Sequence, residues 1–373
     1  MKRRKFLGIA GTSIVIAGSM SYLLSDRNNF VRADIKNSNN DKYSFKPGEK
    51  EILYLASLAP SGHNTQPWFI KYIEPYHWII CNDKNRWLPK VDPTQRETIL
   101  SIGAFMQNLE YAASSLGYKC DFKVLANNNQ DEEITEVKLT NGNSITSFDT
   151  EKIKMRRTIR SGYLKELIKK HDVEFLTGTE AGNVHFISNL SREYLWLNEQ
   201  TIEANRLQTY RDEAQEELSR WMRLSSKEAM KNLDGLTTAG MEINGIPGWI
   251  VRNFYSKEDV LKKSFREQGI DKVVKQVSSS GGWFIITSKD YEVNTLLETG
   301  SKFQQMLLKL RERNIAIHPM TQILEEDATR NLLNKSLEIS KPVQFILRAG
   351  YIKNYPPPVS LRRPVGQIVR MQQ

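Results

Sequence analysis

The sequence of 373 residues holds only two cysteines and five histidines. Cys81 and Cys120 lie far apart among apolar residues, and no group of Cys and His residues has the spacing of a zinc site. We therefore predict two buried thiols and no metal, with a disulfide left open only for an exported protein. The sequence also lacks a recognisable Ser-His-Asp set, so catalysis through an activated nucleophile is not predicted.

Positive charge is abundant but unevenly placed. The formal net charge is +10 at pH 7, and residues 1–33 carry +5 of it, from six basic residues and one aspartate. The rest of the chain is only mildly basic and has no arginine-rich helix. A nucleic-acid partner is therefore not predicted.

The first 33 residues have the pattern of a targeting segment. Lys2-Arg3-Arg4-Lys5 precedes an apolar run from Phe6 to Leu24. Arg3-Arg4-Lys5-Phe6-Leu7 resembles the twin-arginine export signal, which implies the twin-arginine export machinery as a partner and a periplasmic or other extracytoplasmic location. Val31-Arg32-Ala33 fits a small-x-small cleavage pattern, but an uncleaved membrane anchor is the competing interpretation, because the run is about as long as a membrane span. Residues 34–49 are polar and predict a linker.

Residues 50–150 show helix-like and strand-like patterns in alternation. Asp92-Pro93 is a typical helix start, and apolar residues from Ile99 to Ala113 recur at helical spacing. A buried helix is therefore predicted from Asp92 to about Leu116. The other elements that we expect here are a helix over residues 51–58 and strands over residues 68–73, 77–81, 122–125 and 134–139.

The loop between that first helix and first strand is rich in hydrogen-bonding side chains. Pro60 and Gly62 break the helix, and Ser61, His63 and Asn64 to Gln66 then supply hydroxyl, imidazole and amide groups. Such a loop suits a flat heterocycle with donor and acceptor edges. An ordinary polar turn before a strand is the alternative.

The loop also resembles a family signature. Residues 60–68, Pro-Ser-Gly-His-Asn-Thr-Gln-Pro-Trp, are similar to the Pro-Ser-x-x-Asn-x-Gln-Pro-Trp motif of nitroreductase-like flavoproteins. In that family the loop lies against FMN and reaches across from the other half of a dimer. The resemblance therefore implies FMN as cofactor, and it implies contacts to FMN from this loop by Pro60, Ser61, His63, Asn64 and Gln66.

Two basic segments extend the resemblance. Arg156-x-Thr158-x-Arg160 is similar to the family's Arg-x-Ser-x-Lys/Arg element, which implies that Arg156 and Thr158 hold the FMN phosphate and that Arg160 lies near the N1–O2 edge of the flavin ring. Arg362-Arg363-Pro364 resembles the C-terminal basic element that supplies another arginine to the phosphate. Guanidinium groups suit a phosphate dianion, although a solvated basic turn is the alternative for the first segment.

A third segment, 315–322, predicts a strand running into a loop. By resemblance the loop residues Pro319, Met320, Thr321 and Gln322 present backbone N–H groups to flavin N5. Many family members have an acidic residue and a glycine there, so Thr321-Gln322 is a departure from the pattern. His318 is interpreted as a packed histidine rather than a general acid.

An internal similarity bears on the architecture. Gly103-Ala-Phe-Met-Gln107 recurs as Gly300-Ser-Lys-Phe-Gln304, at an offset of 197 residues. Nitroreductases are normally homodimers with flavin at the interface, so a fused pseudo-dimer is predicted, with residues 50–150 and 151–373 as its halves. Chance similarity of two amphipathic helices is the alternative.

The second half carries extra sequence. Residues 198–269 resemble the insertion that caps the flavin in related proteins, with a long helix from Asn198 to about Leu224 and a turn over residues 244–249. Met241, Ile246 and Trp249 are predicted to line a substrate channel; surface helices packed on the core are the alternative.

The resemblance covers about residues 50–370 and is closest to the Acg-type fused FMN-binding proteins. It implies an α+β fold and an FMN-dependent oxidoreductase that reduces nitroaromatic or quinone-like molecules. A small-molecule substrate or electron donor is the expected partner, and pairing of the fused chain into further oligomers is not required. An exported protein should meet little NAD(P)H, however, so a non-catalytic protein that sequesters or stores FMN is the alternative.

Overall fold

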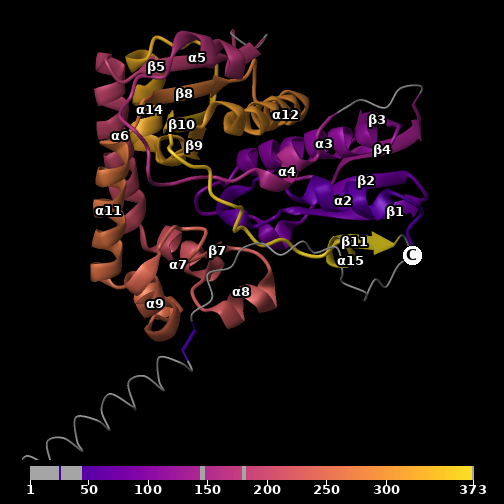
Figure 1. Ribbon diagram of the computed structural model, residues 1–373, viewed down its shortest axis with the longest axis horizontal. Helices are drawn as coiled ribbons and strands as arrows, with labels where there is room; N and C mark the ends of the chain where they lie inside the picture. Colours follow the sequence, from indigo (N-terminus) through magenta and orange to yellow (C-terminus); the bar gives the residue numbers. More distant parts are fainter. Residues whose placement is uncertain (1–24, 27–43, 143–147, 179–181, 372–373) are drawn as a thin grey trace, which may run out of the picture.

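The computed structural model describes residues 25–26, 44–142, 148–178 and 182–371 (Figure 1). The twin-arginine motif, the apolar run to Leu24, the proposed cleavage site and most of the linker lie outside the described residues. Among the described residues no helix is both long and apolar enough to cross a membrane.

The first of two larger sheets has five strands in the order β11-β1-β2-β4-β3. All neighbours are antiparallel except β11, the last strand of the chain, which pairs in parallel with β1. The strands are β1 (Trp68–Glu74), β2 (His77–Asn82), β3 (Tyr118–Val124), β4 (Glu133–Asn141) and β11 (Val369–Met371). Strand β11, from the C-terminal segment, therefore completes a sheet whose other strands all lie between residues 68 and 141.

The second sheet has four antiparallel strands in the order β5-β8-β10-β9. Its strands are β5 (Val184–Ser188), β8 (Gly282–Thr287), β9 (Ile315–Pro319) and β10 (Val343–Tyr351). Matched in sequence order, the strands of this sheet are arranged as β1-β2-β4-β3 are in the first. In both sheets a long helix links the second strand to the third: α3 (Arg96–Ser115) and α12 (Val293–Lys309).

Helices α3 and α12 lie against each other between the two sheets (Figure 1). A Cβ atom placed on Gly103 would lie 2.1 Å from the carbonyl oxygen of Leu297, and one on Gly300 would lie 2.0 Å from that of Leu100. Both glycines thus allow the backbones of the two helices to touch. Adding 197 to Gly103 and Leu100 gives Gly300 and Leu297, so the two contacts involve equivalent positions and are reciprocal.

Two hydrogen bonds between α3 and α12, close to this glycine contact, join residues that the same 197-residue offset relates. Gln305 Nε2 donates to Gln107 Oε1, and Gln304 Nε2 donates to Asn108 Oδ1, each at 2.7 Å. The same offset relates the two pairs.

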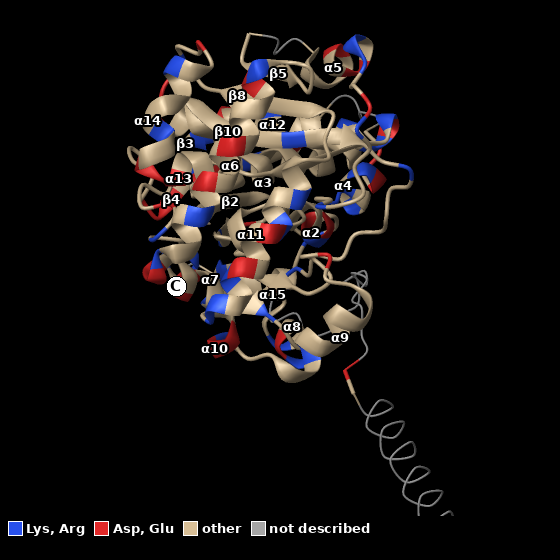
Figure 2. Cartoon of the chain, turned by 90° about the vertical axis from the view of Figure 1, so that its left-hand side faces the viewer, with Lys and Arg blue, Asp and Glu red and all other residues tan. Residues whose placement is uncertain are grey.

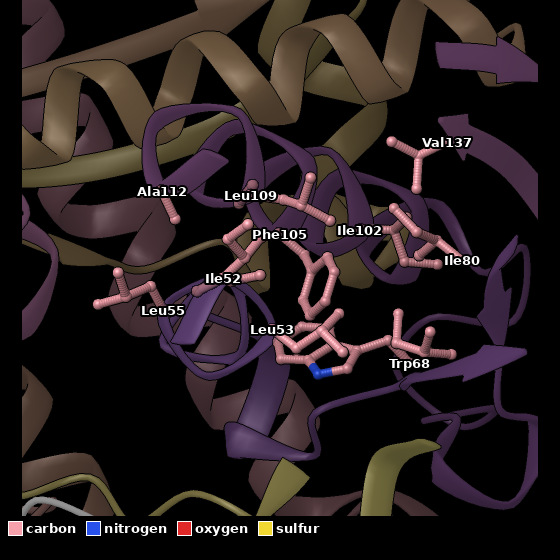
Figure 3. Packing of buried hydrophobic residues seen from close by; sticks show 14 of the residues in the cluster. Ile52, Leu53, Leu55, Trp68, Ile80, Ile102, Phe105, Leu109, Ala112 and Val137 are labelled. Carbon is pink, nitrogen blue, oxygen red and sulfur yellow. The ribbon is translucent and has the colours of Figure 1, made fainter. Parts of the chain in front are cut away.

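The largest core cluster lies between α3, the first sheet and α2 (Glu49–Ser57). Trp68 packs on Phe105 with ring centroids 5.2 Å apart, and Ile52, Leu53 and Leu109 surround them (Figure 3). These residues come from helical positions of period 3.6 and from the inward face of a strand. The helix that leads into the Pro60 loop is therefore fixed by the core.

A segment between β5 and β8 has no counterpart between β1 and β2, which a turn joins directly. This inserted segment consists of several helices and a two-stranded pair. Its elements are α6 (Arg192–Tyr210), α7 (Asp212–Trp221), β6 (Met222–Arg223), α8 (Ser226–Asn232), β7 (Leu236–Thr237), α9 (Gly245–Phe254), α10 (Lys257–Val260) and α11 (Lys263–Val277).

Shorter elements complete the described chain. They are η2 (Gly62–Asn64), η3 (Lys84–Arg86), α4 (Glu151–Met155), α5 (Lys170–Thr177), η5 (Leu310–Arg313), α13 (Gln322–Glu325), α14 (Asp327–Ser336) and α15 (Val365–Ile368).

The α+β class is confirmed, as are the four strands predicted between residues 68 and 139, although β3 begins at Tyr118 and not at Phe122. Two helix predictions and one turn prediction were wrong. The helix expected from Asp92 begins at Arg96, and the Asp92 carboxylate instead accepts from the backbone N–H groups of Glu97 and Thr98. The helix expected from Asn198 to about Leu224 begins earlier, at Arg192, and is interrupted at Arg211, whose guanidinium binds Lys90 O and Glu326.

The third error is the turn expected over residues 244–249, where helix α9 begins. Proline is tolerated in the first turn of a helix, so Pro247 does not prevent it. The two cysteines are free, with Cys81 buried and Cys120 half-buried.

Candidate functional site

A cavity of about 680 Å³ lies where the loop after α2, helix α3, the β9–α13 connection and the inserted segment meet. This volume is typical of sites for small molecules and cofactors. Its apolar wall includes Leu100 and Ala104 from α3, Phe303 from α12, and Tyr255 and Phe265 from the inserted segment.

The cavity gathers most of the predicted site residues from segments far apart in the chain. Those lining it are Pro60, Ser61, His63, Thr158, Arg160, Met241, Pro319, Met320, Thr321 and Gln322. The other predicted residues lie behind this lining or on the outer surface. They are Asn64, Gln66, Arg156, Ile246, Trp249, Arg362 and Arg363.

The loop after α2 has an unusual backbone. His63, Asn64 and Gln66 have φ angles of 46°, 54° and 53°, in the left-handed region that non-glycine residues seldom adopt. Ser61 Oγ accepts from the backbone N–H of Gln66 at 2.9 Å. Strained conformations of this kind persist only where surrounding contacts impose them.

Asn64 and Gln66 provide those contacts from behind the cavity. Asn64 Nδ2 donates to the carbonyl oxygens of Gly235 and Leu361, each at 3.2 Å. Gln66 Nε2 donates to Leu233 O at 2.9 Å, and its Oε1 accepts from Arg363 N at 2.9 Å. The two amides thus fasten the loop to the inserted segment and to the C-terminal segment.

Arg160 lies at the centre of the polar part of the cavity. Its Nε donates to Gly240 O at 3.1 Å, and one Nη donates to His318 Nε2 at 2.5 Å. Its backbone oxygen accepts from Arg348 at 2.8 Å and from Gln276 at 2.9 Å. Burial lowers the pKa of the Arg160 guanidinium.

The histidines beside Arg160 are held neutral. Burial, and then the charge of Arg160, lowers the pKa of His63 to about 4 and that of His318 well below its usual value. Because His318 Nε2 accepts from Arg160, the ring proton is on Nδ1. The Nδ1 atoms of both rings are buried, and no described residue hydrogen-bonds to them.

Glu242 is a site residue that the sequence did not reveal. Its carboxylate accepts from the backbone N–H of Arg160 at 3.1 Å, from the hydroxyl of Ser161 and from Arg157 at 3.4 Å. It thereby holds the segment that carries Arg160. Lys272, which also lines the cavity, donates to Met241 O at 2.6 Å, and burial lowers its pKa. The excess of cations over carboxylates at this end suits an anionic group.

A pair of carboxyl groups on the cavity wall was also missed. Burial, and then the nearby charge of Glu97, raises the pKa of Glu325 to about 8. Glu325 accepts hydrogen bonds from Gln208 Nε2 and from Thr321 Oγ1, at 2.5 and 3.1 Å. At neutral pH this wall therefore carries a protonated carboxyl group. No sequence pattern signals it, because α3 and α13 supply the two residues independently.

The arginines expected at a phosphate converge on one helix end. Arg362 donates to the carbonyl oxygens of Ser57, Leu58 and Ala59 at 2.8, 3.2 and 3.0 Å, and Arg156 donates to Leu58 O at 3.4 Å. Cations there satisfy the unpaired carbonyls at the end of α2 and the helix dipole.

Arg363 likewise donates to Gln66 O and Trp68 O, at 2.7 and 2.9 Å. The structure therefore brings both basic motifs to the loop after α2. It does so on backbone oxygens, and a contact with phosphate stays a prediction.

Of the predicted channel residues, only Met241 lines the cavity. Ile246 is 74% exposed on the outer side of α9, and Trp249 Nε1 donates to Ser25 Oγ at 2.7 Å. Within the described part of the chain, no group of three or more His, Cys, Asp or Glu side chains is placed to hold a metal ion.

Two curated proteins are similar in sequence to most of this chain. The chain is 23% identical over 335 residues to acg, a candidate NAD(P)H nitroreductase of Mycobacterium tuberculosis, covering 87% of this chain and 95% of that protein. It is 21% identical over 339 residues to PigM, a candidate NAD(P)H nitroreductase of a Serratia species, covering 82% of this chain and 89% of PigM.

No family model matches the chain. Among solved structures, it is 13% identical to the FMN-dependent nitroreductase NfnB from Mycobacterium smegmatis in complex with NADPH, covering 60% of this chain and 97% of that one with a TM-score of 0.35. Over most of its length, this chain is similar in sequence to proteins of the nitroreductase-like superfamily.

Proposed function

We propose that this chain is an FMN-dependent oxidoreductase of the nitroreductase type. The observation that carries the proposal is the convergence at one cavity of the Pro60–His63 loop, the Thr158–Arg160 segment and the Pro319–Gln322 loop. These are the three places where the resemblance expects flavin contacts. The names of acg and PigM support NAD(P)H as the electron donor.

The residues at the cavity fit FMN chemically. The Nδ1 atoms of His63 and His318 and Oε1 of Gln322 are buried without hydrogen-bond partners among the described residues. A flavin ring has donors and acceptors along its edges that would satisfy such atoms. Arg160 supplies a cation for a ring edge, and Leu100, Ala104 and Phe303 supply apolar contacts.

FMN, when bound, supplies the transfer of electrons to and from small molecules. The side chains of this protein supply the charged and apolar surroundings of the cofactor. Arg160 offers a fixed positive charge in a site of low dielectric constant, where it stabilises negative charge strongly. Glu325, which also lines the cavity, has a pKa raised to about 8 by burial and therefore offers a protonated carboxyl group at neutral pH, while Leu100, Ala104 and Phe303 offer apolar contacts for an electron-poor nitroaromatic or quinone-like molecule.

The same proposal includes a fused pair of nitroreductase-like halves. It is supported by the matching strand order of the two sheets and by the reciprocal contacts of Gly103 and Gly300. It is also supported by β11, through which the second half completes the sheet of the first. By the resemblance, we assign Arg156, Thr158 and one of the two C-terminal arginines to the FMN phosphate.

Storage or sequestration of FMN is the second candidate, and the inserted segment favours it. Residues from α6, α7, α9 and α11 form one whole side of the cavity, as a cover would. Export by the twin-arginine pathway, which we infer from Arg3-Arg4 and the apolar run, would also separate the protein from NAD(P)H.

The visible absorption spectrum of the purified protein tests these proposals. A flavin band that disappears when NADPH is added under anaerobic conditions supports the oxidoreductase. A band that disappears only with dithionite favours FMN storage or a different electron donor. Arg160→Ala is expected to lose most of the bound flavin, whereas Arg206→Ala, on the exposed side of α6, should keep it. Absence of flavin after reconstitution with FMN would refute both candidates.

A further inference from the structure

We propose that the outer face of helix α9 rests on a lipid membrane. Ile246, Ile250 and Phe254 recur every four residues along this helix and therefore lie on one side of it. Their side chains are 74%, 38% and 67% exposed. Elsewhere the exposed large apolar residues are more scattered, which is normal for a protein surface, whereas a stripe on one helix marks a contact surface.

An adjacent side of α9 faces the cavity. Pro247 and Val251 line the cavity, each one residue after an outward residue and hence about 100° further round the helix, and Tyr255 lines it just past the helix end. Helix α9 thus carries its exposed apolar stripe next to the apolar side that lines the cavity. A helix with an exposed apolar stripe can lie in the interface of a bilayer. Charged side chains of both signs occur on α8 and α10, in the same part of the molecule as α9 (Figure 2).

The N-terminal part of the chain points to lipid as the occupant. Ser25 and Asp26 directly follow the apolar run from Phe6 to Leu24 and dock on α8 and α9. Asp26 exchanges hydrogen bonds with Asn253 at 2.9 and 3.1 Å, and its carboxylate accepts from Ser226 N at 2.5 Å, at the start of α8. A bilayer that takes up the apolar run must therefore lie beside α9.

The rim of the cavity lies next to the outer face of α9. Asn244 and Pro247 line the cavity and are also exposed, as are Gln268 and Gly269 on α11. A membrane at α9 therefore brings the rim close to the acyl chains, from which an apolar molecule such as a long-chain quinone can enter. This last step rests on the proposed function, but the membrane contact does not.

The test uses the full chain reconstituted in vesicles of phosphatidylcholine and phosphatidylglycerol. An environment-sensitive fluorophore is attached to Ile246→Cys or to Phe254→Cys, and for comparison to Leu190→Cys or to Leu332→Cys. The comparison sites are also exposed apolar residues, 82% and 49%, and they lie at the other end of the molecule, near β5 and on α14 (Figure 1). The parent protein, labelled in the same way, gives the background from Cys81 and Cys120.

Acyl chains carrying bromine are expected to quench the fluorophores at residues 246 and 254 at least twofold more than those at residues 190 and 332. Equal quenching at all four sites would overturn the proposal. So would protection of residues 246 and 254 from aqueous iodide before lipid is added, because the face would then be covered by the chain itself or by a second copy. Flavin absorbance in the same samples reports on the proposed function separately.

Discussion

The crossing of α3 and α12 permits a sharp test of the proposed fused architecture. In Gly300→Ala the added methyl group would lie 2.0 Å from Leu100 O, about 1 Å closer than the shortest approach that Cβ atoms make. The obstacle is backbone, which cannot rotate away, so the helices must separate. Overpacking of this kind costs about 1–3 kcal/mol, and better helix propensity offsets only ~0.5–1 kcal/mol.

Gly269→Ala is the matched control. Gly269 is a glycine within helix α11, and no atom lies within 4 Å of the position of its missing Cβ. This variant is expected to gain about 0.5–1 kcal/mol from helix propensity alone. The two Gly→Ala changes should therefore move stability in opposite directions.

Because the contacts of Gly103 and Gly300 are reciprocal, a second variant should behave in the same way. Gly103→Ala should destabilise the protein as Gly300→Ala does, because its methyl group would lie 2.1 Å from Leu297 O. Once one methyl group has separated the helices, the second should cost less, so the double variant should lose less than the sum of the single losses.

Urea unfolding followed by far-UV circular dichroism gives the required free energies. The reasoning would be refuted if Gly300→Ala were as stable as Gly269→Ala, or if the two crossing variants were strictly additive. Flavin affinity is a useful second readout, since Leu100, Ala104 and Phe303 of the crossing helices line the cavity.

Three further predictions concern individual side chains. The unfolded chain releases the Glu325 proton near its usual pKa, whereas the folded state keeps it to about pH 8. The difference in free energy of unfolding between the parent and Glu325→Gln should therefore change in favour of the variant by at most about 1.4 kcal/mol per pH unit as pH rises between these values, because the opposite slope from the neutral His63 and His318 is common to both proteins; unfolding titrations of the two proteins check this. Glu242→Gln weakens the hold on the Arg160 segment, and fluorescence titration should show FMN affinity reduced about tenfold, whereas Glu258→Gln on the exposed α10 should not change it. Arg362→Ala removes the guanidinium donor from Ser57 O and Ala59 O and leaves Leu58 O with only the 3.4 Å hydrogen bond from Arg156, so it should lower the free energy of unfolding by about 3 kcal/mol, with Arg362→Lys only partly restoring the urea midpoint.

Periodicity in the sequence was sufficient to predict most elements of residues 50–150, whereas the α+β class was predicted from the family resemblance. The α3 helix and its strands have clear apolar periods, and the core imposes no exception on them. The inserted segment was predicted less well. The break at Arg211 depends on tertiary contacts to Lys90 and Glu326, about 120 residues away in either direction, which no local pattern contains.

The site was predicted in part for a similar reason. The resemblance brought forward His63, Thr158 and Arg160, because they belong to contiguous motifs. Glu242 and Glu325 lie outside these motifs and acquire their roles only through contacts made in the folded chain. Local patterns therefore identify the residues that a motif contains, whereas the side chains that orient and charge them emerge from the tertiary structure.

The inserted segment has a consequence for how such a protein can diversify. In an assembly of two identical chains, every insertion is present twice, and any change that improves one copy must be tolerated at the other. Here the segment follows β5, while the corresponding strand β1 continues through a tight turn into β2. A single polypeptide can thus place a helical cover beside one of its two sheets and none beside the other. Mutation can then reshape the cover without a matching change at the second sheet.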